Sequence, residues 1–76
     1  MEELMEVLQD VKDDVDFENE TRLIDDGILD SFDLLQIIAS LNDTFDISIP
    51  ASEIVPANFN SAKAMYDMVQ RLAEEG

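Results

Sequence analysis

Apolar residues recur at helical spacing in the first segment of the chain. Between Met1 and about Val15 they stand at i, i+3, i+4, i+7 and i+11 positions: Leu4, Val7, Leu8, Val11 and Val15. This spacing is typical of a helix with one apolar face. Glu2 and Glu3 fall in its first turn, where the positive end of the helix dipole favours acidic side chains. The pattern predicts an amphipathic helix over residues 1–15.

Residues 31–45 carry two apolar stripes. At about 100° per residue, one arc, expected to face the core, contains Leu34, Ile37, Ile38, Leu41 and Phe45. The roughly opposite arc contains Phe32, Leu35 and Ala39, rimmed by Gln36, Asn42 and Asp43. A small apolar stripe with a polar rim indicates a docking surface. The alternative is that Phe32 and Leu35 fold back under the polar connector over residues 16–30, which Phe17, Leu23 and Ile24 pin to the core.

The start of this helix combines a cap with a hydroxyl. Asp30 can accept hydrogen bonds from first-turn amides, and Asp33 stands three residues on, as in a capping box, although Ser31 could equally be the cap. The positive end of the helix dipole would favour a phosphate attached to Ser31. The chain has no histidine, which excludes a Ser-His-Asp nucleophile, and no other activating base is evident. If Ser31 reacts, another protein must activate it.

The remaining segments complete an all-α pattern. Residues 45–50 alternate apolar and polar and are expected to be extended, and residues 51–55 can form at most a short helical turn or two. Phe59 is expected to anchor a loop, and Asn60 to cap a last helix. That helix carries apolar residues at Ala62, Met65, Tyr66, Val69, Leu72 and Ala73. We expect one domain, residues 1–76, folded as a small four-helix bundle of three main helices and one short helix.

Composition and charge narrow the possible partners. The chain has 76 residues, 46% of them apolar, and no cysteine, so a core without disulfides or Cys-based metal sites must stabilise it. A net charge of −15 repels nucleic acid and anionic lipid and attracts basic protein surfaces. No apolar run has the length of a membrane span, and the acidic start is unlike a signal peptide. We therefore expect a cytoplasmic monomer that does not insert into membranes.

The stretch GILDSFDLLQIIASLNDTFDISIP, residues 27–50, resembles the acyl carrier protein family. The family pattern has a glycine, Asp-Ser-Leu or a variant, a helix ending in Phe, and a short extended link to Ile-Pro. In register with it stand Gly27, Asp30, Ser31, Leu41, Phe45, Ile49 and Pro50. The FNSAKAMYDMV stretch is similar to the family's final helix with its cap, so the resemblance covers nearly the whole chain.

The resemblance implies a carrier protein, not an enzyme. Ser31, with Asp30 beside it, would bear 4′-phosphopantetheine, which a phosphopantetheinyl transferase takes from coenzyme A; that enzyme supplies Mg²⁺ and the base. The thiol of the arm would hold an acyl or aminoacyl group as a thioester. A loading ligase and acyl-transferring enzymes would dock basic residues on the second helix, at Phe32, Asp33, Leu35, Gln36, Ala39 and Asp43.

The cargo is left open by departures from the family pattern. The common Leu after the serine is Phe32, and Gln36 and Asn42 stand where fatty-acid carriers often have glutamate. GILDSF and FDISIP are closer to D-alanyl carriers and to stand-alone carriers served by adenylating ligases. In D-alanyl carriers, however, glycine often occupies the place of Asp33, and an aromatic-Asn-Thr-Pro stretch the place of FNSA.

Three other functions fit parts of the sequence. An acidic helical interaction module would leave Ser31 unmodified as a mere cap. Spacing like that of a calcium-binding loop is provided by Asp14, Asp16, Glu18 and Asp25, but position six is Asn19 and not the required glycine, so we expect no specific metal site. Paired carboxylates such as Asp25 and Asp26 could act as acid and base, although adjacent acids in a loop usually point to solvent.

Overall fold

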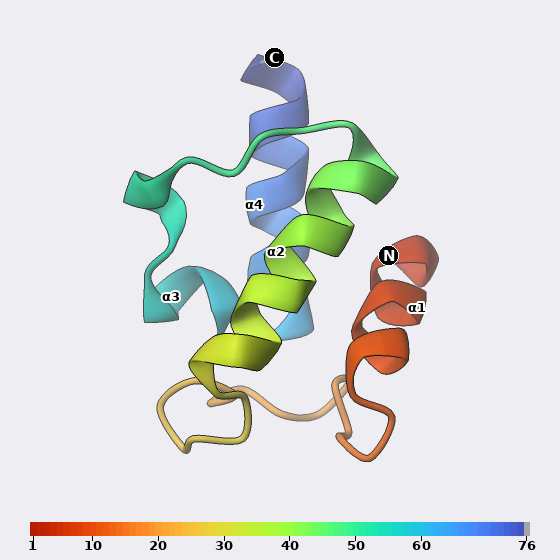
Figure 1. Ribbon diagram of the computed structural model, residues 1–76, viewed down its shortest axis with the longest axis vertical. Helices are drawn as coiled ribbons and strands as arrows, with labels where there is room; N and C mark the ends of the chain where they lie inside the picture. The colour runs from red at the N-terminus through yellow and green to blue at the C-terminus, as the bar shows by residue number, and fades with distance from the viewer. Residues whose placement is uncertain (76) are drawn as a thin grey trace.

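The computed structural model describes residues 1–75 as helices joined by irregular links (Figure 1). The helices are α1 (Glu2–Val11), α2 (Ser31–Phe45), α3 (Pro56–Phe59) and α4 (Ala62–Glu75), with a 3₁₀ turn, η1, at Ala51–Glu53. Within residues 1–75 there is no strand. The predicted all-α fold of three long helices and one short helix is therefore confirmed. α1 packs against α2 and α4, and α3 packs against α4.

α1 ends earlier than the apolar spacing predicted. Its last residue is Val11, and Lys12 is already extended, with φ −150° and ψ 104°. Asp13 and Asp14 follow, and carboxylates are unfavourable at the negative end of a helix dipole. Val15 is half-buried and packs against the core from a turn. The prediction that the helix extends to residue 15 was therefore wrong, because Val15 contacts the core without belonging to the helix.

The connector between α1 and α2 is folded onto the core. As predicted, Phe17 and Leu23 are buried and Ile24 packs against the core, and Leu29 is buried as well. Leu29 N donates to the carbonyl of Leu23 at 3.0 Å, which closes a turn over residues 23–29. Gly27 lies inside that turn with φ 71°, in the left-handed region that glycine adopts most readily.

The α3–α4 corner differs from the prediction at two residues. Phe59 is fully buried as expected, but it ends a short helix that starts with Pro56 at the first helical position instead of lying in a loop. The cap of α4 is Ser61, whose Oγ accepts a hydrogen bond from Ala64 N at 3.1 Å. The prediction that Asn60 caps α4 was wrong, because the Asn60 side chain bonds the connector instead.

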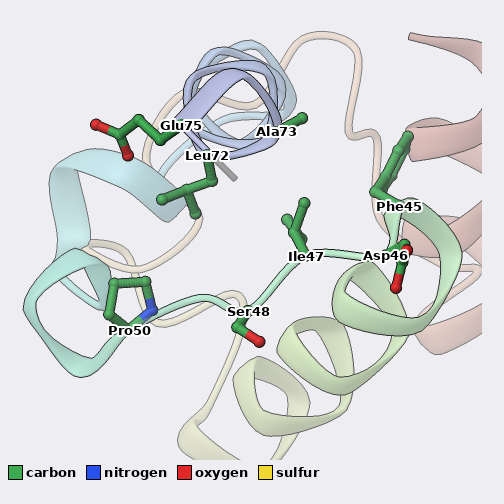
Figure 2. Close-up of a pocket in the computed structure, with 8 residues that line it drawn as sticks. All are labelled: Phe45, Asp46, Ile47, Ser48, Pro50, Leu72, Ala73 and Glu75. Atoms are coloured by element: carbon green, nitrogen blue, oxygen red, sulfur yellow. The ribbon is translucent and has the colours of Figure 1, made fainter.

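The link from α2 to η1 is extended, as expected, and runs past the end of α4. The chain leaves α2 through Asp46, which has φ 53°, and Asn42 Oδ1 accepts from Ile49 N at 3.0 Å. An open hollow of about 620 Å³ lies between this link, the last residue of α2 and the end of α4 (Figure 2). It is at the opposite end of α2 from Ser31, because α2 runs from Ser31 to Phe45.

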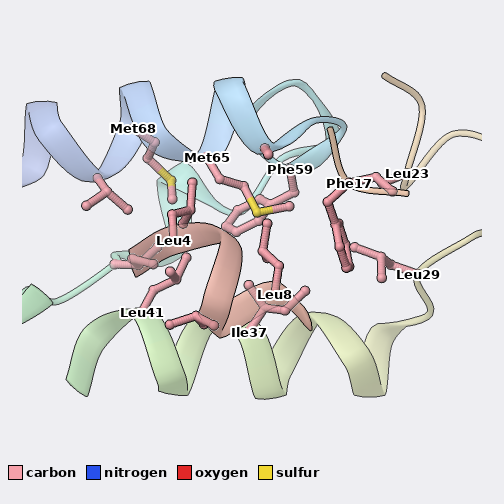
Figure 3. Packing of buried hydrophobic residues seen from close by; sticks show 14 residues of the cluster. Leu4, Leu8, Phe17, Leu23, Leu29, Ile37, Leu41, Phe59, Met65 and Met68 are labelled. Carbon is pink, nitrogen blue, oxygen red and sulfur yellow. The ribbon is translucent and has the colours of Figure 1, made fainter. Parts of the chain in front are cut away.

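The core is apolar throughout the described chain and draws on every helix and on the connector. Its fully buried larger side chains are Leu4, Leu8, Phe17, Leu23, Ile37, Leu41, Phe59, Met65 and Met68 (Figure 3). Phe17, Leu23 and Leu29 close the end of the core where α2 begins. No polar side chain is buried among residues 1–75. None of the helices in this range has the length and apolar character needed to cross a bilayer.

Candidate functional site

The first turn of α2 is fixed by a capping box. Asp33 N donates to Asp30 Oδ1 at 2.8 Å, and Asp30 N donates to Asp33 Oδ2 at 3.4 Å. Each carboxylate thus satisfies an amide that the helix itself leaves without a partner. The predicted pairing of Asp30 with Asp33 is confirmed. Of the two possible caps, the structure selects Asp30, so Ser31 is the first residue of the helix.

Ser31 presents an exposed side chain at the positive end of α2. Its hydroxyl is not needed for the cap, because Asp30 already fills that role. The neighbouring amide dipoles favour negative charge at this end of a helix. An exposed hydroxyl in such a place fits the attachment of a phosphate-linked group. The chain has no histidine that could accept the proton of this hydroxyl.

An ion pair joins this turn to Lys12, the residue directly after α1. Lys12 Nζ donates to Asp33 Oδ2 at 3.0 Å, and the side chains are 33% and 16% exposed. The hydrogen bond from Lys12 lowers the pKa of Asp33, and the same contact raises the pKa of Lys12. Asp33 was expected to meet a partner protein. In the structure its carboxylate supports the cap and receives Lys12, and docking through Asp33 stays a prediction.

The second apolar stripe of α2 faces away from the core. Phe32 and Leu35 are 67% and 65% exposed and Ala39 is exposed, whereas Ile37 and Leu41 on the other face are buried. The two-stripe prediction is confirmed, and the connector does not cover Phe32. Gln36 and Asp43 beside the stripe are exposed. The rim differs from the prediction at Asn42, which is half-buried and accepts a hydrogen bond from the link to η1.

Two further exposed apolar residues precede α3. Ile54 and Val55 are 38% and 41% exposed. Their neighbour Glu53 receives Arg71 Nη2 at 2.8 Å and Asn58 Nδ2 at 3.1 Å, so this segment is held to α3 and α4. Arg71 lowers the pKa of Glu53. Sequence reasoning missed this exposed pair, because a two-residue segment before a proline has no periodicity that would identify a face.

Three acidic residues of the connector have hydrogen-bond or ion-pair partners within the chain. Asp16 Oδ2 accepts from Asn19 Nδ2 at 2.8 Å, Asp25 Oδ2 accepts from Asn60 Nδ2 at 3.1 Å, and Asp26 lies 3.5 Å from Arg22. Among residues 1–75 no three potential metal-binding side chains come together. The geometry therefore gives no support to the calcium-loop or paired-carboxylate alternatives.

Each basic side chain of the protein lies in an ion pair. The pairs are Lys12–Asp33, Arg22–Asp26, Lys63–Asp67 and Arg71–Glu53. The chain contains 4 lysines and arginines against 19 acidic residues. The remaining carboxylates dominate the charge that the surface offers to a partner, which favours binding to basic proteins.

Comparisons with known proteins agree with this geometry. The family described as a phosphopantetheine attachment site matches residues 2–69. The chain is 33% identical over 67 residues to a D-alanyl carrier protein of Lactobacillus delbrueckii subsp. bulgaricus, covering 88% of this chain and 79% of that protein. It is 38% identical over 63 residues to aminoacyl carrier protein 2 of Bradyrhizobium diazoefficiens, covering 83% and 70%.

A third relative spans almost the whole of both chains. The D-alanyl carrier protein of Lactococcus lactis subsp. lactis is 30% identical over 76 residues, covering 97% of this chain and 96% of its own. The match of the family to most of the chain, together with these relatives, settles the family. The chain belongs to the phosphopantetheine-attachment family of carrier proteins, which hold acyl or aminoacyl groups on a covalently bound phosphopantetheine arm.

Proposed function

We propose that Ser31 is the residue that bears the 4′-phosphopantetheine arm and that the chain is a carrier without catalysis of its own. The single observation that carries this proposal is the exposed Ser31 hydroxyl at the start of α2, released from capping by Asp30. When bound, the arm supplies a thiol that holds the cargo as a thioester. The part of the chain is to present the hydroxyl in a fixed first turn and to favour the attached phosphate through the helix dipole.

The attachment needs a partner enzyme for every step except presentation of the hydroxyl. A bond forms between Ser31 Oγ and the phosphorus that carries the pantetheine group, and the diphosphate bond of coenzyme A breaks. Adenosine 3′,5′-bisphosphate leaves, and the hydroxyl proton passes to a base of the transferase. The carboxylates nearest in sequence, Asp30 and Asp33, are occupied by the capping box.

Intact-mass measurement tests the attachment. The protein is incubated with coenzyme A, Mg²⁺ and a broad-specificity phosphopantetheinyl transferase. We expect the wild type and Ser48→Ala, which removes another exposed serine hydroxyl, to gain one phosphopantetheine group, and Ser31→Ala to gain none. An unmodified wild type beside a carrier that the same enzyme modifies would instead support the acidic interaction module, in which Ser31 stays unmodified.

We propose that partner enzymes dock on the exposed face of α2. The docking surface comprises Phe32, Asp33, Leu35, Gln36, Ala39 and Asp43, and its apolar centre with acidic neighbours suits a basic protein surface. Leu35→Glu and Ala39→Glu should slow modification of Ser31 while leaving the helical fold intact. Ala73→Glu adds the same charge at an exposed position of α4 and serves as the control. Unfolding of either α2 variant, or equal slowing in the control, contradicts this surface.

We propose an aminoacyl cargo, with D-alanine the first candidate and an adenylating ligase as the loading enzyme. The similarity to proteins named D-alanyl and aminoacyl carrier proteins supports this class. The test incubates the phosphopantetheine-bearing protein with ATP and candidate amino-acid ligases and detects a hydroxylamine-sensitive mass increase. Loading by a fatty-acyl ligase, without any by amino-acid ligases, would reassign the cargo to acyl chains.

We also propose that residues 1–76 act as one monomeric carrier domain in the cytoplasm. The net charge of −15 makes two copies repel each other, which supports the monomer. Light scattering at physiological salt should give the mass of a single 8.6 kDa chain. A mass of twice that value would contradict the proposal.

A further inference from the structure

Asn60 bonds three consecutive residues of the connector that leads to Ser31. Its carbonyl oxygen accepts from Leu23 N at 2.9 Å. Its Oδ1 accepts from Ile24 N at 3.0 Å and from Asp25 N at 3.1 Å, and its Nδ2 donates to Asp25 Oδ2 at 3.1 Å. Both ends of the Asn60 amide are thus directed at a segment about 35 residues earlier in the chain.

These bonds hold the first half of a turn whose second half leads to the attachment site. Leu23 O accepts from Leu29 N at 3.0 Å, and Ile24 O accepts from Gly27 N at 3.0 Å. Leu29 is buried, and the next residue is Asp30, the cap of α2. A continuous path of hydrogen bonds and packing therefore runs from Asn60 through the turn over residues 23–29 to the first turn of α2.

The rest of α2 is held by different contacts. Ile37 and Leu41, farther along the helix, are fully buried in the core. A loss of the Asn60 contacts should therefore loosen the connector and the cap while the body of the helix stays in place. The exposed stripe at Leu35 and Ala39, which lies on that body, should keep its position.

We infer that Asn60 is a positioning residue for Ser31: its hydrogen bonds to Ile24 and Asp25 hold the turn that places the acceptor hydroxyl for the transferase. This inference rests on the proposed attachment at Ser31. It assigns Asn60 no contact with the arm or with coenzyme A. It acts on the reaction by fixing the position of residues 29–31 and by keeping them ordered.

Steady-state kinetics of modification separate positioning from docking. For Asn60→Ala we expect kcat of the transferase reaction to fall about tenfold, since misplacement of a reacting group by about 1 Å can cost up to about a hundredfold in rate. KM should change little, because the docking surface is unaltered. Asn19→Ala is the matched control, since it removes an exposed side-chain bond of the connector, 2.8 Å to Asp16, outside the 23–29 turn.

A reciprocal exchange supplies a readout that does not depend on Asn60→Ala folding well. N60D keeps the acceptor for the two amides but places a carboxylate against that of Asp25, and kcat should fall. In the double variant N60D/D25N the donor and acceptor are exchanged, because the side chain at position 25 now donates and the carboxylate at position 60 accepts. This variant should recover most of kcat. Hydrogen exchange of the Ile24, Asp25 and Leu29 amides should quicken in N60D and slow again in the double variant.

The outcomes distinguish this inference from the attachment itself. Unchanged kcat in folded Asn60→Ala, an equal loss in Asn19→Ala, or no recovery in N60D/D25N would overturn the positioning role. If the wild type accepts no phosphopantetheine, the attachment at Ser31 fails, and the positioning role fails with it. Hydrogen exchange then reports separately whether Asn60 orders the turn over residues 23–29.

Discussion

The contact between Lys12 and Asp33 makes the stability of the protein depend on pH in a defined way. The hydrogen bond lowers the pKa of Asp33 below its ordinary value and raises the pKa of Lys12 above its ordinary value. A carboxyl group whose pKa is lower in the folded protein stabilises the fold at pH values above its pKa in the unfolded chain. That stability is lost as the pH falls through the pKa of the folded protein. A lysine whose pKa is higher in the folded protein stabilises the fold at pH values below its pKa in the unfolded chain. That stability is lost as the pH rises through the pKa of the folded protein.

Lys12→Met should therefore lower the free energy of unfolding near neutral pH, and the deficit should shrink in acid as Asp33 takes up its proton. Urea unfolding from about pH 7 to pH 3 measures this. Lys63→Met is the control, because its partner Asp67 and Lys63 itself are 62% and 79% exposed and such pairs contribute little. A deficit that is the same at both pH values would show that Lys12 acts through packing alone.

The same truncation should destabilise the protein strongly on the buried face of α2 and hardly at all on the exposed face. Leu41 is fully buried and Leu35 is 65% exposed. Leu41→Ala should lower the free energy of unfolding by roughly 2–5 kcal/mol, because it removes buried apolar surface and leaves a cavity. Leu35→Ala should change it by less than about 0.5 kcal/mol. Urea unfolding measures both variants. A large loss of stability in Leu35→Ala would mean that the exposed stripe packs against other parts of the chain.

At the scale of whole elements, α2 was the most predictable. Apolar spacing and the Asp30–Asp33 box agree on one helix, and its observed bounds equal those expected. α1 was less predictable, because Val15 continues the spacing while two aspartates after Lys12 oppose a longer helix. Periodicity records which residues meet the core, and it cannot tell whether the chain reaches the core as a helix or as a turn.

The start of α4 marks a different limit. Asn60 and Ser61 are both favoured cap residues. The choice between them depends on the hydrogen bonds that Asn60 Oδ1 accepts from the backbone N–H groups of residues 35 and 36 positions earlier. The Lys12–Asp33 pair likewise joins residues 21 apart. Ser31 and its apolar stripe were predictable because a cap and a helical face are local patterns. The residues that hold Ser31 in place were not, because their partners are set by tertiary packing.

Because of the dipole of α2, replacing aspartate by asparagine should change the free energy of unfolding in opposite directions at the two ends of the helix. Asp46 terminates α2, whose last turn has no basic residue, so its negative charge faces the negative end of the dipole. Asp46→Asn should raise the free energy of unfolding by about 0.5 kcal/mol. Asp33→Asn at the first turn should lower it, because it weakens the cap and the ion pair with Lys12. Urea unfolding at low salt measures both variants, and changes of the same sign would contradict a dipole effect.

For the molecule as a whole, charge opposes the fold. A chain of 76 residues carries a net charge of −15, and its four basic side chains are already in ion pairs. Salt screens the repulsion among the many unpaired carboxylates more than it weakens four attractive contacts. The melting temperature should therefore rise between about 0.02 and 0.5 M NaCl, as measured by circular dichroism. A decrease would mean that the ion pairs contribute more than the repulsion.

The same charge should give partner docking the opposite response to salt. Basic enzymes approach an acidic carrier with electrostatic steering, which salt suppresses. At low substrate concentration the rate of Ser31 modification should thus fall over the salt range in which the fold becomes more stable. Modification of Leu35→Glu and wild type should be compared at each concentration, because added charge at the docking surface changes steering without changing the core. If the modification rate rises with salt as the melting temperature does, fold stability and not docking limits modification, and the acidic surface of α2 is not what the transferase recognises.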